Sequence, residues 1–202
     1  MSFEIDVARR LGEAEIRASF TAGAGLTALF GPSGAGKTNV LNMVAGLLRP
    51  EAGRIVANGE TLFGEGIDLP PERRRAGYVF QDGRLFPHRR VRDNLRYGRR
   101  SGGRFGFDEV VAFLGIADLL DRWPRTLSGG EAQRVAIGRA LLSGPGFLLM
   151  DEPLAYLDSA RADEIMRVIE RIRDELKLPI LYVSHARAEV ERLATRVVPI
   201  HR

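Results

Sequence analysis

Hydrophobic and polar residues alternate near the start of the chain. The alternation covers residues 3–7 and again 16–20, with a turn-forming segment at 11–13 between them. A period of two is typical of strands with one buried face. Residues 54–63 contain two more short apolar runs around Asn58-Gly59, a dipeptide that favours a two-residue hairpin. The first third of the chain therefore predicts an antiparallel sheet.

A second pattern consists of short, continuous apolar runs separated by segments with helical spacing. Runs of this kind cover residues 26–30, 77–80, 147–150, 180–183 and 197–200. Helical patterns at 160–176 and 187–193 alternate with the last three runs, an order typical of a parallel α/β sheet. Between residues 82 and 145 the pattern changes to short helices. We therefore predict an α/β fold with a parallel-sheet core, an antiparallel β edge and an inserted helical subdomain.

Composition narrows the class of protein without deciding it. With 202 residues, 45% of them hydrophobic, the chain is long enough for one substantial core and predicts a single folded unit. It has no apolar run of membrane-spanning length and no secretory signal, so we expect it in the cytoplasm. Because it has no cysteine and only three scattered histidines, the only metal that it implies is Mg²⁺ with a nucleotide.

The positive charge suggests an anionic partner but does not identify one. The formal net charge is +4, and arginines concentrate between residues 84 and 104. The aromatic residues there form no repeated stacking pattern, so a solvated face is favoured over a nucleic-acid surface.

Residues 31–38 carry the most informative motif. The segment Gly31-Pro32-Ser33-Gly34-Ala35-Gly36-Lys37-Thr38 matches G-x-x-x-x-G-K-[ST] and follows an apolar run. Glycines let backbone N–H groups approach phosphate oxygens, and the first turn of a following helix adds further N–H groups. That helix is predicted from the apolar residues Val40, Leu41, Val44 and Leu47, with Gly46 and Pro50 closing it. All eight motif residues are therefore predicted to bind a nucleotide, in preference to forming an ordinary glycine-rich turn.

Two side chains in this motif have distinct predicted roles. Of 30 basic residues only Lys37 and Lys177 are lysines, and a compact ammonium reaches between phosphates where a planar guanidinium does not fit. The hydroxyl of Thr38 is a predicted ligand of Mg²⁺.

Two carboxylates follow the apolar run 147–150. At the end of a parallel strand beside a phosphate loop, Asp151 would hold Mg²⁺ and Glu152 would accept a proton from an attacking water. An acidic loop is the alternative for this pair alone, but the phosphate loop in the same chain favours hydrolysis.

Residues 127–134, LSGGEAQR, form a second helix start suited to anions. Ser128, Gly129 and Gly130 precede a helical pattern, so their backbone is predicted to bind phosphate. A serine N-cap with Glu131 in the first turn is the structural alternative.

Taken in order, these motifs resemble those of the nucleotide-binding subunits of ABC transporters over essentially the whole chain. The correspondence is Walker A at 31–38, the Q-loop at Gln81, the signature at 127–134, Walker B at 147–152, the D-loop at Leu157-Asp158 and the switch histidine at His185. The resemblance implies a P-loop NTPase with a RecA-like core in 1–81 and 146–202 and a helical subdomain in 82–145. His185 by itself could be a plain strand-end histidine.

The same resemblance implies the mechanism and the assembly. Glu152 would be the general base, His185 would contact the γ-phosphate and the water, and Gln81 would link Mg²⁺ to the surface that meets a transmembrane permease. The signature of one subunit would close over ATP held by another, which gives a head-to-tail homodimer in the ATP-bound state.

Residues 77–88 and 91–98 look most like those of importers, and among these most like molybdate importers, although sulfate, polyamine and sugar importers have related stretches. This implies a permease, an indirect binding-protein partner and a place on the cytoplasmic face of the membrane, with no nucleic acid.

The chain departs from the family pattern at three places. No aromatic residue lies between Val7 and Ala14 to stack on adenine, so Arg9 or Arg10 is the candidate; Tyr156 stands where a small residue is usual. The sequence ends at Arg202, so we expect no C-terminal regulatory domain.

Two rival classes have the same nucleotide head. The head of a DNA-repair or chromosome-organising ATPase would need a long coiled coil or zinc modules, and the segment between Gln81 and Leu127 is too short and lacks cysteine. A non-hydrolysing subunit would not need Lys37, Glu152 and His185 together.

Overall fold

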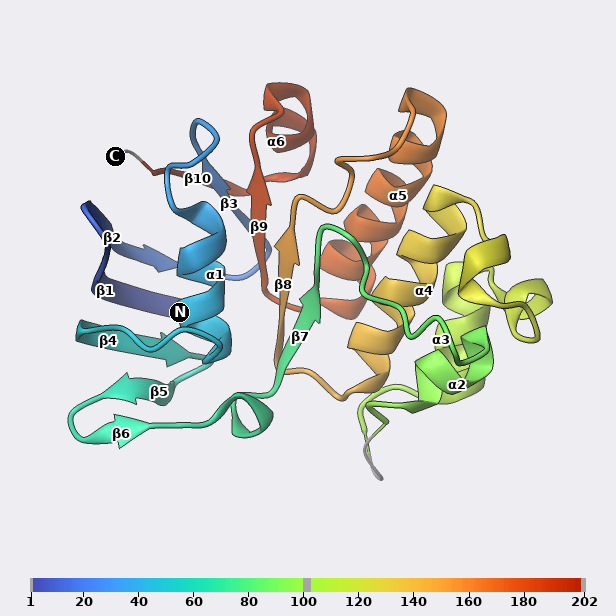
Figure 1. Cartoon of the computed structure of the whole chain (residues 1–202), viewed down its shortest axis with the longest axis horizontal. Helices are drawn as coiled ribbons and strands as arrows, with labels where there is room; N and C mark the ends of the chain where they lie inside the picture. Colours follow the sequence, from blue (N-terminus) through green and yellow to red (C-terminus); the bar gives the residue numbers. More distant parts are fainter. Residues whose placement is uncertain (1, 100–102, 201–202) are drawn as a thin grey trace.

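The protein consists of two sheets and a group of helices (Figure 1). The structure is a computed structural model that describes residues 2–99 and 103–200. One sheet is antiparallel, with the strand order β2-β1-β4-β5-β6, and the other is parallel, with the order β10-β3-β9-β8-β7. The predicted combination of an antiparallel edge and a parallel α/β core is confirmed.

The antiparallel sheet is made of two hairpins and a short edge strand. Its strands are β1 (Phe3–Leu11), β2 (Ala14–Ala22), β4 (Ala52–Ala57), β5 (Glu60–Gly64) and β6 (Ile67–Asp68). Asn58 and Gly59, with φ of 50° and 79°, form the predicted turn, because both central residues of such a turn need positive φ. Leu11 pairs with Ala14, which places the first turn where the sequence predicts it.

The parallel sheet brings the carboxyl ends of its strands to one edge, the upper edge in Figure 1. Its strands are β3 (Leu26–Phe30), β7 (Ala76–Val79), β8 (Phe147–Asp151), β9 (Ile180–Ser184) and β10 (Arg196–Pro199). Every residue of β8 and β9 is buried, which explains their continuous apolar sequences. Loops that follow β3, β8 and β9 therefore meet at one place.

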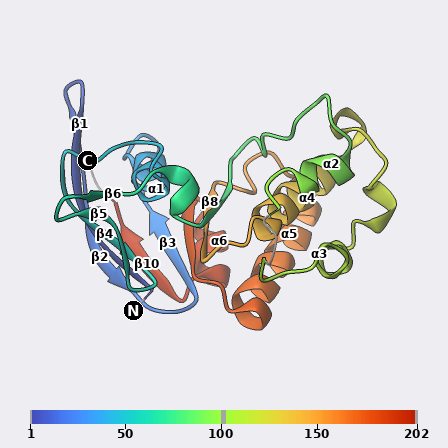
Figure 2. The same ribbon diagram turned by 90° about the horizontal axis from the view of Figure 1, so that it is seen from below.

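Two hydrophobic cores lie on opposite faces of this parallel sheet. Along β8, Leu148 and Met150 pack into the core shared with the helical region. Phe147 and Leu149 pack into the other core, together with the antiparallel sheet and the first helix. The alternation follows from the period of two along a strand. Figure 2 shows the antiparallel sheet and the helical region at opposite ends of the molecule.

The helices of the core are α1 (Lys37–Ala45), α5 (Ser159–Arg171) and α6 (Arg187–Leu193). Helix α1 is closed by Gly46, as the sequence predicts, and Leu47, whose spacing matched the helical pattern, lies past its end. Gly46 adopts a left-handed conformation with φ of 80°, which ends the helix, and the side chain of Leu47 is 54% exposed. The helix predicted at 160–176 changes at Ile172 into a five-residue π-helical segment, Ile172–Leu176.

All described elements between β7 and β8 are helical, as predicted. They are α2 (Val91–Arg96), α3 (Phe107–Leu114), α4 (Gly129–Leu142) and 3-10 turns at Ala117–Leu119 and Pro124–Thr126; a further 3-10 turn, Pro71–Arg73, precedes β7. Helix α4 packs against α2, α3 and α5. None of the helices in the described ranges is long and apolar enough to span a membrane.

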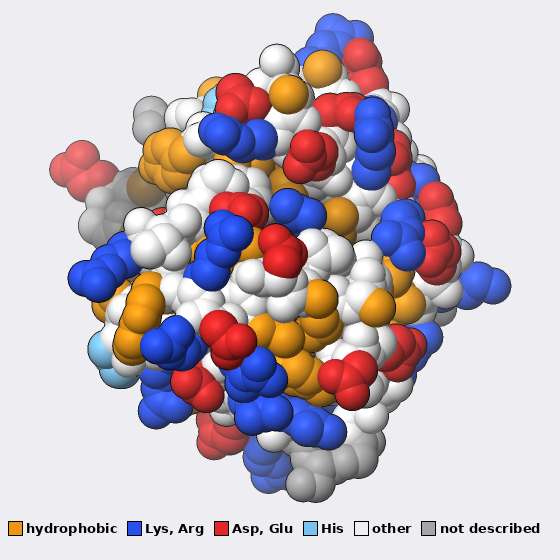
Figure 3. Space-filling view, turned by 90° about the vertical axis from the view of Figure 1, so that its right-hand side faces the viewer, with side chains coloured by type: hydrophobic (Ala, Val, Ile, Leu, Met, Phe, Trp, Pro, Cys, Tyr) orange, Lys and Arg blue, Asp and Glu red, His pale blue; other side chains and the backbone are white. Residues whose placement is uncertain are grey.

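The outer face of the helical region carries charges of both signs. In Figure 3, Lys and Arg side chains lie among Asp and Glu side chains across this face. Ion pairs join Arg84 to Asp82 and Arg92 to Asp121. This arrangement agrees with the predicted solvated face.

Candidate active site

The glycine-rich loop between β3 and α1 is shaped by backbone conformations that favour glycine. Gly34 and Gly36 have φ of 78° and 91°, and a Cβ added at Gly31 would lie 2.2 Å from the carbonyl oxygen of Ile200. Lys37 is only 4% exposed, and its Nζ donates hydrogen bonds of 2.8 Å to the carbonyl oxygens of Gly31 and Pro32. The ammonium is thus held against the loop, beside the first turn of α1.

A hydroxyl and a carboxylate from distant parts of the chain meet next to this loop. Thr38 donates a hydrogen bond of 2.9 Å from Oγ1 to Oδ1 of Asp151 at the end of β8. Burial raises the pKa of Asp151, while the hydrogen bond from Thr38 and the charge of Lys37 oppose the rise. A hollow of about 290 Å³ adjoins the pair and is also lined by Gln81 and Tyr156. Its oxygen donors are of the kind that Mg²⁺ prefers, so the residues present fit this ion.

The second carboxylate lies beside the predicted switch histidine. Glu152 has φ of 42°, a left-handed conformation that is strained for a residue with a side chain. Its N–H donates to the carbonyl of Val183 on the neighbouring strand β9, and its Oε1 lies 3.1 Å from Nδ1 of His185. Because β8 and β9 are adjacent, the residues that follow their ends are brought together. A carboxylate and an imidazole at this distance can share a proton.

A group of hydroxyls fixes the turn that contains His185. Glu189, in the first turn of α6, accepts hydrogen bonds from Tyr182 Oη (2.7 Å) and Ser184 Oγ (2.8 Å). Ser184 Oγ in turn accepts from the N–H of Ala186. Burial and the neighbouring Glu189 raise the pKa of Tyr182, so it stays a neutral donor. The sequence prediction missed this group, although the position of Glu189, one turn after His185, was the available signal.

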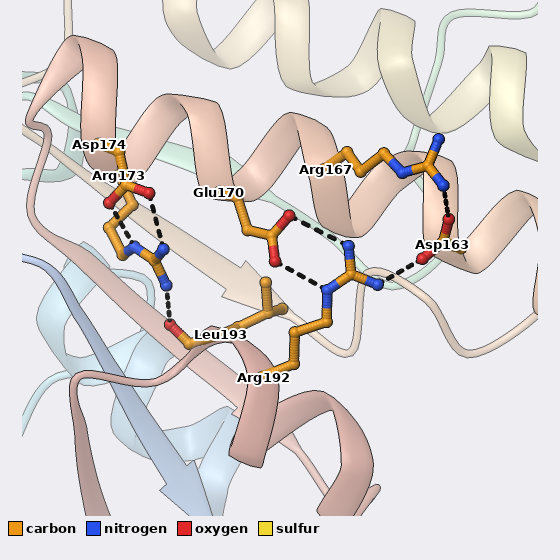
Figure 4. Close-up of polar contacts among 7 residues, drawn as sticks. All are labelled: Asp163, Arg167, Glu170, Arg173, Asp174, Arg192 and Leu193. Carbon is orange, nitrogen blue, oxygen red and sulfur yellow. Dashed lines mark hydrogen bonds and ion pairs between the residues drawn. The ribbon is translucent and has the colours of Figure 1, made fainter.

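Ion pairs then join α6 to α5 (Figure 4). Arg192 forms a forked pair with Glu170 and also contacts Asp163. Arg173, in the π-helical segment that follows α5, donates a hydrogen bond of 2.7 Å to the carbonyl of Leu193 at the end of α6. Helix α6 is therefore tied to the rest of the molecule at both ends.

The predicted Q-loop residue contacts Tyr156, the residue before the predicted D-loop. Nε2 of Gln81 donates to Oη of Tyr156 over 3.3 Å. Both residues line a second hollow of about 310 Å³, which also includes Gly129 and Gln133. The side chain of Gln133 is buried, and its Nε2 has no hydrogen-bond partner within the described residues.

Ser128 caps α4. This geometry is compatible with both interpretations of residues 127–134, the phosphate-binding helix start and the serine N-cap. The N–H of Glu131 donates to Ser128 Oγ, and the N–H of Ser128 donates to Glu131 Oε2 over 2.7 Å, which lowers the pKa of Glu131. The hollow beside Gly129 is lined by neither Lys37 nor Thr38. Within one chain, the two predicted phosphate-binding helix starts therefore border different hollows.

Comparison with known proteins decides the family. The sequence profile described as "ABC transporter" matches residues 16–155. The chain belongs to the ABC transporter family.

Curated relatives of this ABC chain include the molybdenum import ATP-binding protein ModC of Brucella abortus, which is 59% identical over 199 residues. The ModC protein of Rhodospirillum rubrum is 58% identical over 203 residues. These alignments cover 96% and 98% of this chain but only 55% of each relative. The chain thus spans about half the length of the curated relatives that it matches.

Solved structures support the same assignment. A dimer of the ATP-binding cassette MJ0796 in a post-hydrolysis state, bound to ADP and Pi, has a TM-score of 0.76 at 25% identity, covering 99% of this chain and 94% of that one. A second dimeric structure of MJ0796 has a TM-score of 0.78 at 25% identity and covers 98% and 93%. The fold of this ABC chain is therefore that of an ABC cassette.

Proposed function

We propose that this chain is the ATP-binding and hydrolysing part of an ABC importer subunit, with molybdate or a related oxyanion as cargo. The observation that carries the catalytic part is the junction at the edge of the parallel sheet, where Thr38 meets Asp151 and Glu152 meets His185. The names of the ModC relatives support the cargo.

The phosphates of ATP are bound by the loop residues Gly31, Pro32, Ser33, Gly34, Ala35, Gly36, Lys37 and Thr38. Thr38, Asp151 and Gln81, which line one hollow, are the ligands for Mg²⁺. When bound, Mg²⁺ supplies positive charge that offsets the negative charge of the β- and γ-phosphates.

Glu152 accepts the proton of the attacking water, and His185 orients the water and the γ-phosphate. Their 3.1 Å contact supports this pairing, because a base and the group that orients the water must lie side by side at one site. The hydrogen bonds that Glu189 accepts from Tyr182 and Ser184 fix the turn that carries His185 and keep its imidazole beside Glu152.

The signature residues Ser128, Gly129 and Gly130 contact the ATP of a partner subunit. Two copies related head to tail bring each signature opposite a phosphate loop, so ATP drives homodimer formation. The dimeric MJ0796 structures support this assembly.

We further propose that the chain consists of a RecA-like core with an antiparallel β edge (1–81 and 146–202) and a helical subdomain (82–145). The partners are permease subunits and, indirectly, a substrate-binding protein, which place the chain on the cytoplasmic face of the membrane.

The test is Glu152→Gln, which keeps the shape of the side chain but removes the proton acceptor. ATP hydrolysis should fall by about 10²–10⁴-fold while ATP binding persists. In size-exclusion chromatography, the variant with Mg-ATP should run as a dimer and return to monomer when ATP is removed.

Glu60→Gln, at an exposed position of β5, is the matched control and should hydrolyse ATP like the wild type. A Glu152→Gln variant with the wild-type rate would show that Glu152 is not the base. Molybdate-stimulated hydrolysis in vesicles containing the permease and the binding protein tests the cargo, and stimulation by a sugar or a polyamine but by no oxyanion would contradict it.

A further inference from the structure

Tyr156 is an aromatic side chain on the surface beside the active site. It lies in the loop between β8 and α5 and is 77% exposed, more than any other large hydrophobic residue in the described ranges. Its hydroxyl accepts the hydrogen bond from Gln81, so one end of the ring is anchored. An anchored but exposed ring has apolar surface left to bury.

The position of this ring is defined by the two hollows. Tyr156 lines the hollow beside Thr38 and Asp151, and it also lines the hollow beside Gly129. The ring thus lies between the phosphate loop side and the signature side of its own subunit. Figure 1 agrees, since the β8–α5 loop, the β3–α1 loop and the start of α4 all lie along the upper edge.

The two-fold symmetry of the proposed dimer determines what Tyr156 faces. A two-fold rotation that places the phosphate loop of one subunit opposite the signature of its partner also places the signature opposite the partner's loop. The rotation axis must then pass midway between a subunit's own loop and its own signature. An exposed residue at that midpoint faces its own copy across the axis.

We propose that the Tyr156 side chains of two subunits pack against each other at the two-fold axis of the ATP-bound dimer. This inference rests on the proposed head-to-tail dimer and adds a contact specific to this chain. The surroundings suit it, because Pro124, Pro153 and Leu157 line the hollow beside the ring and give apolar neighbours. Aromatic pairs of this kind favour association beyond the area that they bury.

The absence of cysteine from the sequence provides a direct test. In the Glu152→Gln background, Tyr156→Cys introduces one thiol, and a short bis-maleimide should join two such subunits when Mg-ATP is present. The same variant without nucleotide should stay uncross-linked. Leu47→Cys is the matched control: Leu47 is exposed but lies past the end of α1, away from the phosphate loop, and should not cross-link.

Size-exclusion chromatography of the same samples separates two failures. A Tyr156→Cys variant that forms the ATP-bound dimer but does not cross-link would overturn the inference and leave the proposed function standing. If Glu152→Gln itself forms no dimer with Mg-ATP, the proposed head-to-tail assembly is overturned. The Tyr156 contact, which rests on that assembly, is then overturned as well.

A second measurement tests the ring without cysteine. In the Glu152→Gln background, Tyr156→Phe should retain the dimer dissociation constant within about threefold, whereas Tyr156→Ser should raise it by about tenfold. Equal constants for the two variants would contradict a ring-to-ring contact.

Discussion

Arg74 lies in the interior, where it closes the end of α1. Its Nη1 donates to the carbonyl oxygens of Met43 (2.7 Å) and Val44 (3.2 Å), and its Nε donates to that of Leu69 (2.6 Å). The last carbonyls of a helix have no partner inside the helix, so Arg74 provides a donor for Val44 and a second donor for Met43, whose carbonyl also accepts from the N–H of Gly46. Burial lowers the pKa of Arg74, opposed by the charge of Asp68.

Replacing Arg74 by methionine should lower the free energy of unfolding by about 2–4 kcal/mol, since the side chain is fully buried and its removal takes a hydrogen-bond donor from each of these carbonyls. Urea denaturation followed by circular dichroism measures the change. The neighbouring exposed residue gives the control, and Arg73→Met should stay within about 0.5 kcal/mol of wild type. Equal stability of the two variants would show that Arg74 does not cap α1.

At the scale of elements, the short helix α6 determines where the switch histidine lies. Glu189→Gln should reduce kcat for ATP hydrolysis by about tenfold and leave the KM for ATP nearly unchanged, because the turn around His185 loosens while the phosphate loop is untouched. Steady-state kinetics over a range of ATP concentrations measures the split.

Glu191→Gln is the matched control for this change. Glu191 lies on the same helix, but it pairs with the exposed Arg187. The control should keep the wild-type kcat. A rise in KM for Glu189→Gln without a fall in kcat would contradict the positioning role.

The ion pairs between α5 and α6 make a pH-dependent contribution. The hydrogen bonds from Arg192 hold the pKa values of Asp163 and Glu170 below their usual range. A carboxylate with a lowered pKa contributes stability above its unfolded pKa of about 4, and the contribution is lost as the pH falls through the folded value. Arg192→Met should therefore melt below the wild type at about pH 7, and the two should converge below about pH 3. Melting temperatures across this range test it, and a constant difference would contradict the linkage.

At the scale of the whole molecule, the distribution of charge separates the importer from the DNA-bound alternative. Many arginines of the helical region already have partners: Arg122 pairs with Glu131, Arg90 lies over Trp123 and Arg96 lies over Phe107. Duplex DNA should therefore bind no more tightly than a non-specific affinity of about 10⁻⁴–10⁻⁶ M. Fluorescence anisotropy at low and physiological salt measures this. Nanomolar, ATP-dependent binding would favour the DNA-repair class.

The sequence by itself determined the order of the elements, the two sheet types and the phosphate loop with Lys37. These features depend on residues close together in the chain, such as the period of two in β1 and β2 and the Asn58-Gly59 turn. The spacing of apolar residues alone would carry α1 to Leu47, but the glycine at position 46 predicts the end of the helix, and its left-handed backbone provides that end.

Only the tertiary structure decided which distant residues meet. The strand order β3-β9-β8 places Asp151 beside Thr38 and Glu152 beside His185. Spacing along the chain does not specify such contacts, because they arise from the packing of parallel strands whose connections run through helices. The same holds for Tyr156, whose place between two hollows is set by the fold of three loops at one end of the sheet.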